Sequence, residues 1–329
     1  MMSNFIHLQT KSHYSISCGL PKTNEIVDKA IESGMKAVAL ADKNTFFGLV
    51  KFYNYALSKG IKPICGVDFD IKVNNGYTNL ILLAKNKKGL EKLFKLSTGS
   101  FVNSGSEKRS IPEQDILNDP ENIVCIIPAS SSNLRNLALK KEESSILDLY
   151  KKYFEAFAEN LFVGVSNFSE DGYDFASALV CNLARKSDIS VVAINDVLFL
   201  EKEDHLAHQA KVAINNATLL KDEIDNPNVS NEQYFKTEEE LAKCHELEPL
   251  NNTFEVAKLC NVFLEEGQYY LPSYEVQENK SLSEHLEDLS RTKLKEYLSD
   301  HKELDQDLYH ERLEKELKII TEKGYPGYF

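Results

Sequence analysis

Residues 37–84 read AVALADKNTFFGLVKFYNYALSKGIKPICGVDFDIKVNNGYTNLILLA, and this stretch decides the fold. Two apolar, β-branched runs, Ala37–Ala41 and Ile64–Val73, flank a helical pattern over Thr45–Ser58. The second run turns at Asn74-Asn75-Gly76 into a third, Leu80–Ala84, and an Asn-Gly pair is a strong hairpin signal. The order strand, helix, strand, strand is typical of a sheet covered by helices.

The same alternation continues through most of the chain. Short apolar runs recur at Phe5–Leu8, Ala37–Ala41, Ile64–Val73, Leu80–Ala84, Ile123–Ile127, Leu161–Val165 and Ser190–Ile194. This rhythm predicts the α/β class, as a distorted seven-stranded βα barrel. Helices are expected over Thr23–Gly34, Thr45–Ser58, Lys88–Leu96, Ser145–Phe157, Tyr173–Ser187 and Lys202–Ile214, with a surface loop over the polar stretch Ser97–Ser110.

Beyond this point the pattern becomes helical throughout. Helices are expected over Thr237–Cys244, Asn252–Cys260, Ser281–Leu298 and Asp305–Lys323, and Ser281 with Glu284 fits a capping box. Gly267–Tyr274, with Pro272, is the expected linker. We therefore expect a first domain at 1–270 and a mostly helical segment at 271–329. Because few chains end by exposing three aromatic side chains, we also expect this chain to be a piece of a longer protein.

Composition limits the function classes. The 329 residues are 42% hydrophobic and 27% charged, as in ordinary soluble proteins, and no apolar stretch approaches the length of a membrane span. The six cysteines are far apart, which favours buried free thiols in a reducing cytoplasm over disulfides or a zinc ribbon. The net charge of −13 predicts weak or no DNA binding by this chain alone.

Barrels of this kind carry their chemistry at the carboxyl ends of the strands. The candidate positions there are Gln9, Lys11, Asp42, Lys43, Asp68, Asn79, Ser130, Phe168, Asp196 and Leu198. They include three carboxylates but no histidine. Acidic residues at strand ends also often cap the next helix or turn, so residue types alone leave a capping role open.

Several segments, taken in order, resemble the successive motifs of the polymerase-and-histidinol-phosphatase (PHP) domain. They are FIHLQTKSHYS (5–15), ALADKNTFFGLVKFY (39–53), GIKPICGVDF (60–69), NLILLAKNKKGLEKL (79–93), VVAINDVLFL (191–200) and EKEDHLAHQAKVAI (201–214). More narrowly, they resemble the copy at the N-terminus of bacterial DNA polymerase III alpha subunits. FKTEEELAKC (235–244), NTFEVAKLCNV (252–262), YYLPSY (269–274) and RLEKELKIITEKGYPGYF (312–329) resemble the segments that lead to the polymerase palm.

The resemblance implies a seven-stranded βα barrel that, in active members, holds divalent metals and hydrolyses phosphoesters. Carried across, Gln9 and Lys11 replace a histidine pair, Lys43 and Asn79 replace further histidines, and Leu198 replaces the last one. Ser130 stands near a cysteine position and Phe168 near a histidine position. Asp42, Asp68 and Asp196 remain as vestigial ligands, and the lysines are expected to repel metals and to pair with Asp42 or Asp196. The resemblance thus implies no metal, no other cofactor and no catalytic residue in this chain.

The first functional hypothesis is a structural module that docks the proofreading exonuclease subunit. The full-length protein would then be a DNA-directed DNA polymerase of the cytoplasmic polymerase III holoenzyme, using magnesium and contacting DNA outside this chain, without a membrane partner. The alternative is a metal-dependent phosphoesterase, for proofreading or for pyrophosphate removal, with an atypical site that adds His13 or Asn79 to the three aspartates. A stand-alone histidinol-phosphatase-like enzyme is disfavoured by the segments after the barrel.

Two further patterns have more than one interpretation. Asp68 and Asp70 share one face of a strand, as polymerase metal ligands do, but the surrounding GIKPICGVDFDI resembles the third barrel strand. We therefore expect Asp68 at the barrel mouth and Asp70 as an ordinary strand residue. His205 and His208, three apart on an expected helix, are interpreted as packing or surface residues.

Overall fold

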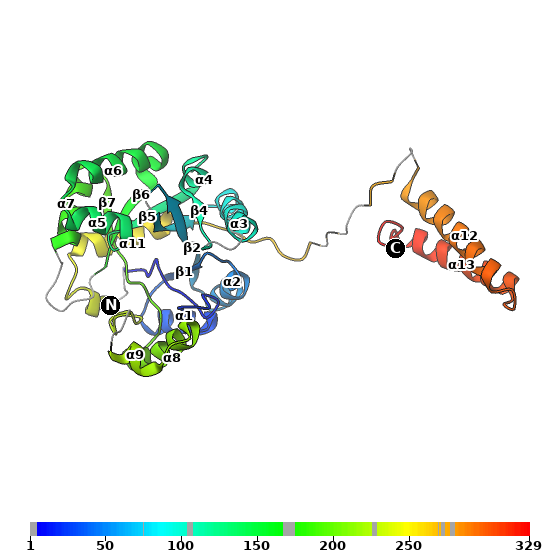
Figure 1. Ribbon diagram of the computed structural model, residues 1–329, viewed down its shortest axis with the longest axis horizontal. Helices are drawn as coiled ribbons and strands as arrows, with labels where there is room; N and C mark the ends of the chain where they lie inside the picture. The colour runs from blue at the N-terminus through cyan, green and yellow to red at the C-terminus, as the bar shows by residue number, and fades with distance from the viewer. Residues whose placement is uncertain are drawn as a thin grey trace. The chain divides into compact units, whose positions relative to one another are not determined.

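A mixed β-sheet forms the centre of the first of two units. The computed structural model describes residues 5–74, 76–103, 108–166, 175–225, 229–268, 270, 274–276 and 280–329. The chain divides into compact units at Met1–Leu264 and Glu265–Phe329 (Figure 1). The boundary predicted from the sequence lies at residue 270.

The strands follow the predicted apolar runs closely. The sheet has the order β1 (Ala37–Lys43), β2 (Lys62–Val73), β3 (Gly76–Ala84), β5 (Ile123–Pro128), β6 (Leu161–Val165) and β7 (Ser190–Ala193), and β4 (Ile111–Pro112) pairs with β2. β2–β3 and β3–β5 are antiparallel, whereas the other pairs are parallel. Of the predicted Asn-Gly turn, Asn75 lies outside the described residues, but Val73 opposes Gly76 as a hairpin requires.

The predicted strand at Phe5–Leu8 is wrong. The first segment, residues 5–11, nevertheless closes the sheet. Its irregular backbone accepts hydrogen bonds from β1, through Ala39 N to His7 O (2.9 Å) and Ala41 N to Thr10 O (2.8 Å). On its other side, Lys11 N donates to Val197 O (3.0 Å) beyond β7. The curled α/β fold is therefore confirmed, with β4 rather than the first segment as the seventh strand of the sheet.

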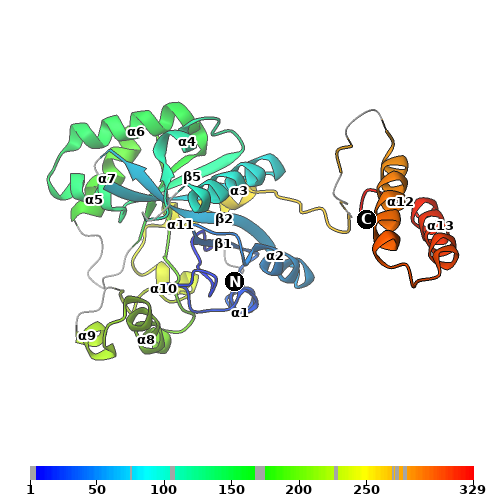
Figure 2. The same ribbon diagram turned by 45° about the vertical axis from the view of Figure 1, so that its right-hand side comes forward.

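Helices surround the sheet (Figure 2). Expected helices appear as α1 (Thr23–Glu32), α2 (Leu49–Ser58), α3 (Lys87–Val102), α6 (Glu143–Phe157), α7 (Phe175–Lys186), α8 (His205–Asn216), α10 (Glu238–Leu241) and α11 (Leu247–Leu259). The sequence pattern missed α4 (Glu113–Leu117), α5 (Ser132–Leu139) and α9 (Leu220–Asp225). The loop predicted from Ser97 is wrong up to Val102, because Ser97 and Ser100 are buried and bond to backbone carbonyls.

Two apolar clusters lie on the two faces of the sheet. The outer cluster joins the strands to the surrounding helices, as Leu40 and Phe52 illustrate. The inner cluster fills the barrel with residues such as Leu8, Ile81 and Ile194, and α11 adds Val256 to it. The core of the first unit therefore includes its last helix.

The second unit is a pair of helices, α12 (Leu282–Asp300) and α13 (Gln306–Glu322). Arg291 of α12 pairs with Glu314 of α13, and Leu298 and Leu317 are buried. The capping box of Ser281 with Glu284 is confirmed. The expected linker, Gly267–Tyr274, lies partly outside the described residues. In the described part of the chain, no helix is long and apolar enough to cross a membrane.

Candidate functional site at the barrel mouth

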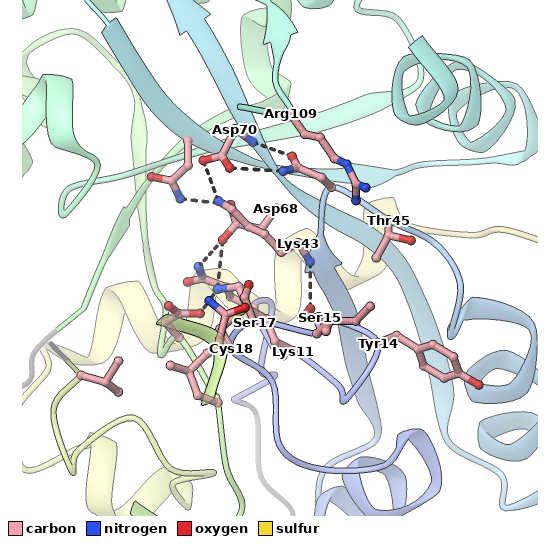
Figure 3. A pocket seen from close by; sticks show the side chains of 18 of the residues that line it. Lys11, Tyr14, Ser15, Ser17, Cys18, Lys43, Thr45, Asp68, Asp70 and Arg109 are labelled. Carbon is pink, nitrogen blue, oxygen red and sulfur yellow. Dashed lines mark hydrogen bonds and ion pairs between the residues drawn. The ribbon is translucent and has the colours of Figure 1, made fainter. Parts of the chain in front are cut away.

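A cavity of about 940 Å³ opens where the strands end (Figure 3). Of the ten predicted positions, eight line it: Gln9, Lys11, Lys43, Asp68, Asn79, Ser130, Asp196 and Leu198. Asp42 is buried and is not among the lining residues, and Phe168 lies outside the described residues. The structure therefore brings eight of the ten positions together at one cavity.

Asp68, on β2, is the centre of the polar cluster. Its Oδ2 accepts from Lys11 Nζ (3.0 Å) and Gln9 Nε2 (3.1 Å). Its Oδ1 accepts from Lys43 Nζ (3.1 Å) and Asn79 Nδ2 (3.2 Å). Burial alone would raise the pKa of Asp68, but the charges of Lys43 and Lys11 outweigh it and hold this pKa well below its usual range. The carboxylate is therefore ionised and saturated with donors.

Lys11 links two strand ends. Its ammonium group pairs with Asp196 as well as with Asp68, and its side chain is only 4% exposed. Burial alone would lower the pKa of Lys11, but Asp196 and Asp68 outweigh it and raise this pKa. Gln233 adds a hydrogen bond to Asp196 Oδ2 (3.3 Å). Lys11 is thus a fixed cation at neutral pH.

Lys43 makes the corresponding bridge on the other side of Asp68. Its Nζ lies 3.0 Å from Asp70 Oδ1, and Lys108 Nζ lies 3.2 Å from the same oxygen. Asn44 donates to Asp70 Oδ2 (3.2 Å). The expectation that Asp70 is an ordinary strand residue is wrong, because the two-residue period of β2 directs Asp68 and Asp70 to the same face, into the cavity.

Asp42 has a different role from the other aspartates. Its Oδ1 accepts from Ser12 N (2.7 Å) and Ser15 Oγ (2.6 Å), and its Oδ2 accepts from Ser12 Oγ (2.8 Å). Burial raises the pKa of Asp42, and the hydrogen bonds from Ser15 and Ser12 oppose that shift. Asp42 therefore caps the loop after the first segment, and the lysine pairing expected for it goes to Asp68, Asp70 and Asp196.

The histidines near the mouth have packing roles. His208 Nε2 lies 2.7 Å from Cys18 O, and His205 Nε2 lies 2.9 Å from Val229 O. His13 is outside the cavity lining and contacts Pro21 O. These contacts agree with the packing interpretation and give the atypical site no histidine.

The residues present do not fit the divalent metals that active PHP domains are expected to hold. Around Asp68 stand two ammonium and two amide groups. Ammonium groups have no lone pair to offer a metal, and they repel it. Within the described ranges, no group of three or more His, Cys, Asp or Glu side chains is placed to hold a metal ion.

Comparison with known proteins identifies the domain. The PHP domain profile matches residues 7–168. The DNA polymerase III subunit alpha of Buchnera aphidicola subsp. Schizaphis graminum (strain Sg) is 34% identical, over 100% of this chain and 29% of that protein. The subunit from Escherichia coli (strain K12) is 32% identical, over 99% and 29%. The chain thus spans less than a third of the length of these relatives.

Among solved structures, an amidohydrolase from Chromobacterium violaceum aligns with a TM-score of 0.42 and 13% identity, over 59% of this chain and 87% of that one. Residues 7–168 match the PHP domain profile, and the chain over its whole length is similar to the N-terminal part of bacterial DNA polymerase III alpha subunits.

Proposed function

We propose that this chain is the N-terminal region of a replicative DNA polymerase alpha subunit, and that its PHP domain is a structural and partner-docking module. The observation that carries the proposal is the pairing of Asp68 with both Lys11 and Lys43. By the resemblance, these two ammonium groups occupy the place where active phosphoesterases of the family hold metal ions. Ion pairs would therefore stabilise the barrel mouth in place of a metal ion.

The charge states in the cluster argue against hydrolysis. A general base needs a pKa near the working pH. The pKa of Asp68 is held low by Lys43 and Lys11 against the effect of burial, while the pKa of Lys11 is raised by Asp196 and Asp68 against the same effect. Neither group therefore exchanges a proton near pH 7, and the ammonium groups around Asp68 would repel a metal ion that could activate water instead.

The proposed partners follow from the similarity to alpha subunits. A fold that has lost its ligands can still act through its outer surface, and we assign that surface to the separate proofreading exonuclease subunit of the polymerase III holoenzyme. Nucleotidyl transfer, with magnesium, belongs to the full-length protein in the cytoplasm. The net charge of −13 leaves DNA contacts to other regions.

Metal analysis tests the degenerate site. The purified chain, dialysed after exposure to zinc, manganese and magnesium, is expected to retain no stoichiometric ion in mass spectrometry. The carboxylates in the cavity, Asp68, Asp70 and Asp196, favour a second candidate, the metal-dependent phosphoesterase. Stoichiometric metal together with metal-dependent phosphodiester hydrolysis, lost in Asp68→Asn, would replace the first proposal with the second.

Complex formation tests the docking role. The chain and the proofreading exonuclease subunit of the same bacterium are mixed at micromolar concentration and separated by size-exclusion chromatography. Co-elution is expected, and an unrelated acidic protein of similar size serves as the control for non-specific association. Separate elution of the two proteins at these concentrations would contradict the docking role.

A further inference from the structure

We propose that the mouth of this cavity binds a short peptide segment in which a carboxylate stands next to an aromatic side chain. The binding surface is the cavity rim, defined as Phe47, Phe101, Lys108 and Arg109, all of which line the cavity. The inference deepens the docking role and rests on it, because it names the chemistry of the segment that a partner would insert.

The charges of the cavity do not cancel. Among the described residues, its basic side chains are Lys11, Lys43, Lys108 and Arg109, and its acidic side chains are Asp68, Asp70 and Asp196. Each of these carboxylates already has a lysine partner. The cavity therefore carries one surplus positive charge, in a chain whose net charge is −13.

Arg109 is the group that supplies this surplus. Its guanidinium carbon lies 4.3 Å from the ring centre of Phe101, and no carboxylate within the described residues pairs with it. Figure 3 shows its side chain at the same side of the cavity as Asp70 and Thr45. The guanidinium lies over this ring, and the N–H edge of a guanidinium matches the two oxygens of a carboxylate.

An apolar surface lies beside the guanidinium. Phe47 is 62% exposed, and its ring centre lies 5.7 Å from that of Phe101. Ile16, which is 74% exposed, also lines the cavity. Phenylalanine and arginine are enriched at protein interfaces, and arginine is among the residues that contribute most to the binding energy. The rim thus offers a surface for a ring next to a site for a carboxylate.

A peptide fits this surface better than a nucleic acid does. Nucleic acid binding rests on several cations that neutralise successive phosphates, whereas the rim has one unpaired cation. The cavity volume of about 940 Å³ is large enough for a drug-sized group or a few side chains. One carboxylate on Arg109 and one ring on Phe47 would neutralise the surplus and cover the exposed apolar surface.

A synthetic peptide tests the inference on the intact chain. The probe is fluorescein-labelled Glu-Phe-Glu-Phe with a blocked C-terminus, and the control probe has lysine in place of glutamate. Fluorescence anisotropy is expected to show saturable binding of the first probe, weakened by added salt, and no binding of the second. Arg109→Ala and Phe47→Ala are each expected to raise the dissociation constant by about tenfold.

Matched variants control for general effects on the surface. Phe175 is 56% exposed, Lys258 has a 55% exposed side chain, and neither lines the cavity. Phe175→Ala and Lys258→Ala are expected to leave the dissociation constant unchanged. Circular dichroism tests whether all four variants are folded. Folding is expected because the replaced side chains are largely exposed.

Three outcomes would overturn the inference. They are no binding of the glutamate peptide to the wild-type chain, equal binding of the lysine peptide, and unchanged affinity in both rim variants. Displacement by oligothymidylate at lower concentration than unlabelled peptide would reassign the rim to nucleic acid. If the exonuclease subunit still binds while the peptide does not, this inference fails and the docking role stands.

Discussion

Lys11 is a buried cation that pairs with two carboxylates at the barrel mouth. Lys11→Met would keep the length of the side chain but leave Asp68 and Asp196 with one cation fewer in a buried setting. Removing one partner of a buried ion pair typically costs about 3–5 kcal/mol. We therefore expect the free energy of unfolding to fall by about that amount. Urea denaturation followed by circular dichroism measures it.

The control for this change is Lys22→Met. The Lys22 side chain is 68% exposed and pairs only loosely with Glu25, at 3.5 Å. Exposed pairs contribute about 0–1 kcal/mol, so this variant is expected to stay close to wild type. If both variants unfold at the same urea concentration, the pairs of Lys11 are not structural and the cluster needs another explanation.

His7 predicts an acid sensitivity of the fold. Burial lowers its pKa to about 4, against the opposing hydrogen bond to Lys236 O. Between about pH 6.5 and pH 4 the unfolded chain binds a proton that the folded chain does not, so stability falls as pH falls through this window. A shift of this size corresponds to roughly 3 kcal/mol.

The measurement is the free energy of unfolding at several pH values in wild type and in His7→Gln. The variant is expected to lose less stability between pH 6.5 and 4.5, because it has removed one of the groups that titrate there. His13→Gln, at an exposed position, is the control and should follow wild type. Parallel curves for wild type and His7→Gln would contradict the assignment.

At the level of residues, the location of a side chain at the barrel mouth was easier to predict than its ion-pair partner. Strand ends placed Lys11, Lys43 and Asp68 at the mouth because such ends meet at one side of a barrel. The pairing of Lys11 with Asp196 joins residues 185 positions apart and depends on how the sheet curls, which no local pattern encodes. Asp70 was expected to be an ordinary strand residue, although its spacing from Asp68 places both side chains on the face that lines the cavity.

Helix α3 offers a matched pair of glycines. A Cβ at Gly89 would lie 2.0 Å from Asn122 O, a backbone atom that cannot move aside easily, whereas at Gly99 the nearest atom is 3.7 Å away. Gly89→Ala is therefore expected to destabilise the chain by about 2 kcal/mol or more. Gly99→Ala is expected to stabilise it by about 0.5–1 kcal/mol, since alanine loses less entropy in a helix.

Thermal unfolding followed by circular dichroism at 222 nm measures both effects, which should have opposite signs. A higher midpoint for Gly89→Ala would mean that the approach of α3 to Asn122 is looser than the structure shows.

The elements show what a local pattern captures. Long apolar runs with turn signals predicted β1 to β3 and β5 to β7. In β1, β5 and β6 nearly every residue is buried, so few polar positions interrupt the run. The first segment has the same composition but no regular ladder. Side chains complete its hydrogen bonding instead: the Thr10 hydroxyl donates to Ala39 O, and Ile6 N donates to Thr253 Oγ1 (3.0 Å).

At the scale of the whole molecule, the alternation of apolar runs and helical patterns predicted the α/β class and the mostly helical C-terminal part. It did not predict which helix completes the core of the barrel. α11 follows the barrel in sequence and looks like the start of the helical part. Its Val256 and Ala257 nevertheless belong to the inner cluster of the barrel, because the end of the barrel opposite the mouth would otherwise expose apolar strand residues.

This division predicts how the chain tolerates truncation. Both apolar clusters lie before Leu264, so a chain that ends there should unfold with a midpoint within about 3 °C of the full chain, since it loses none of their contacts. A chain that ends at Glu246 loses α11, including the Thr253 hydroxyl that accepts a hydrogen bond from Ile6 N. Because α11 completes the inner cluster, this shorter chain should not fold cooperatively. Differential scanning calorimetry of the two truncated chains distinguishes these outcomes. A large loss in the longer one would show that α12 and α13 stabilise the barrel.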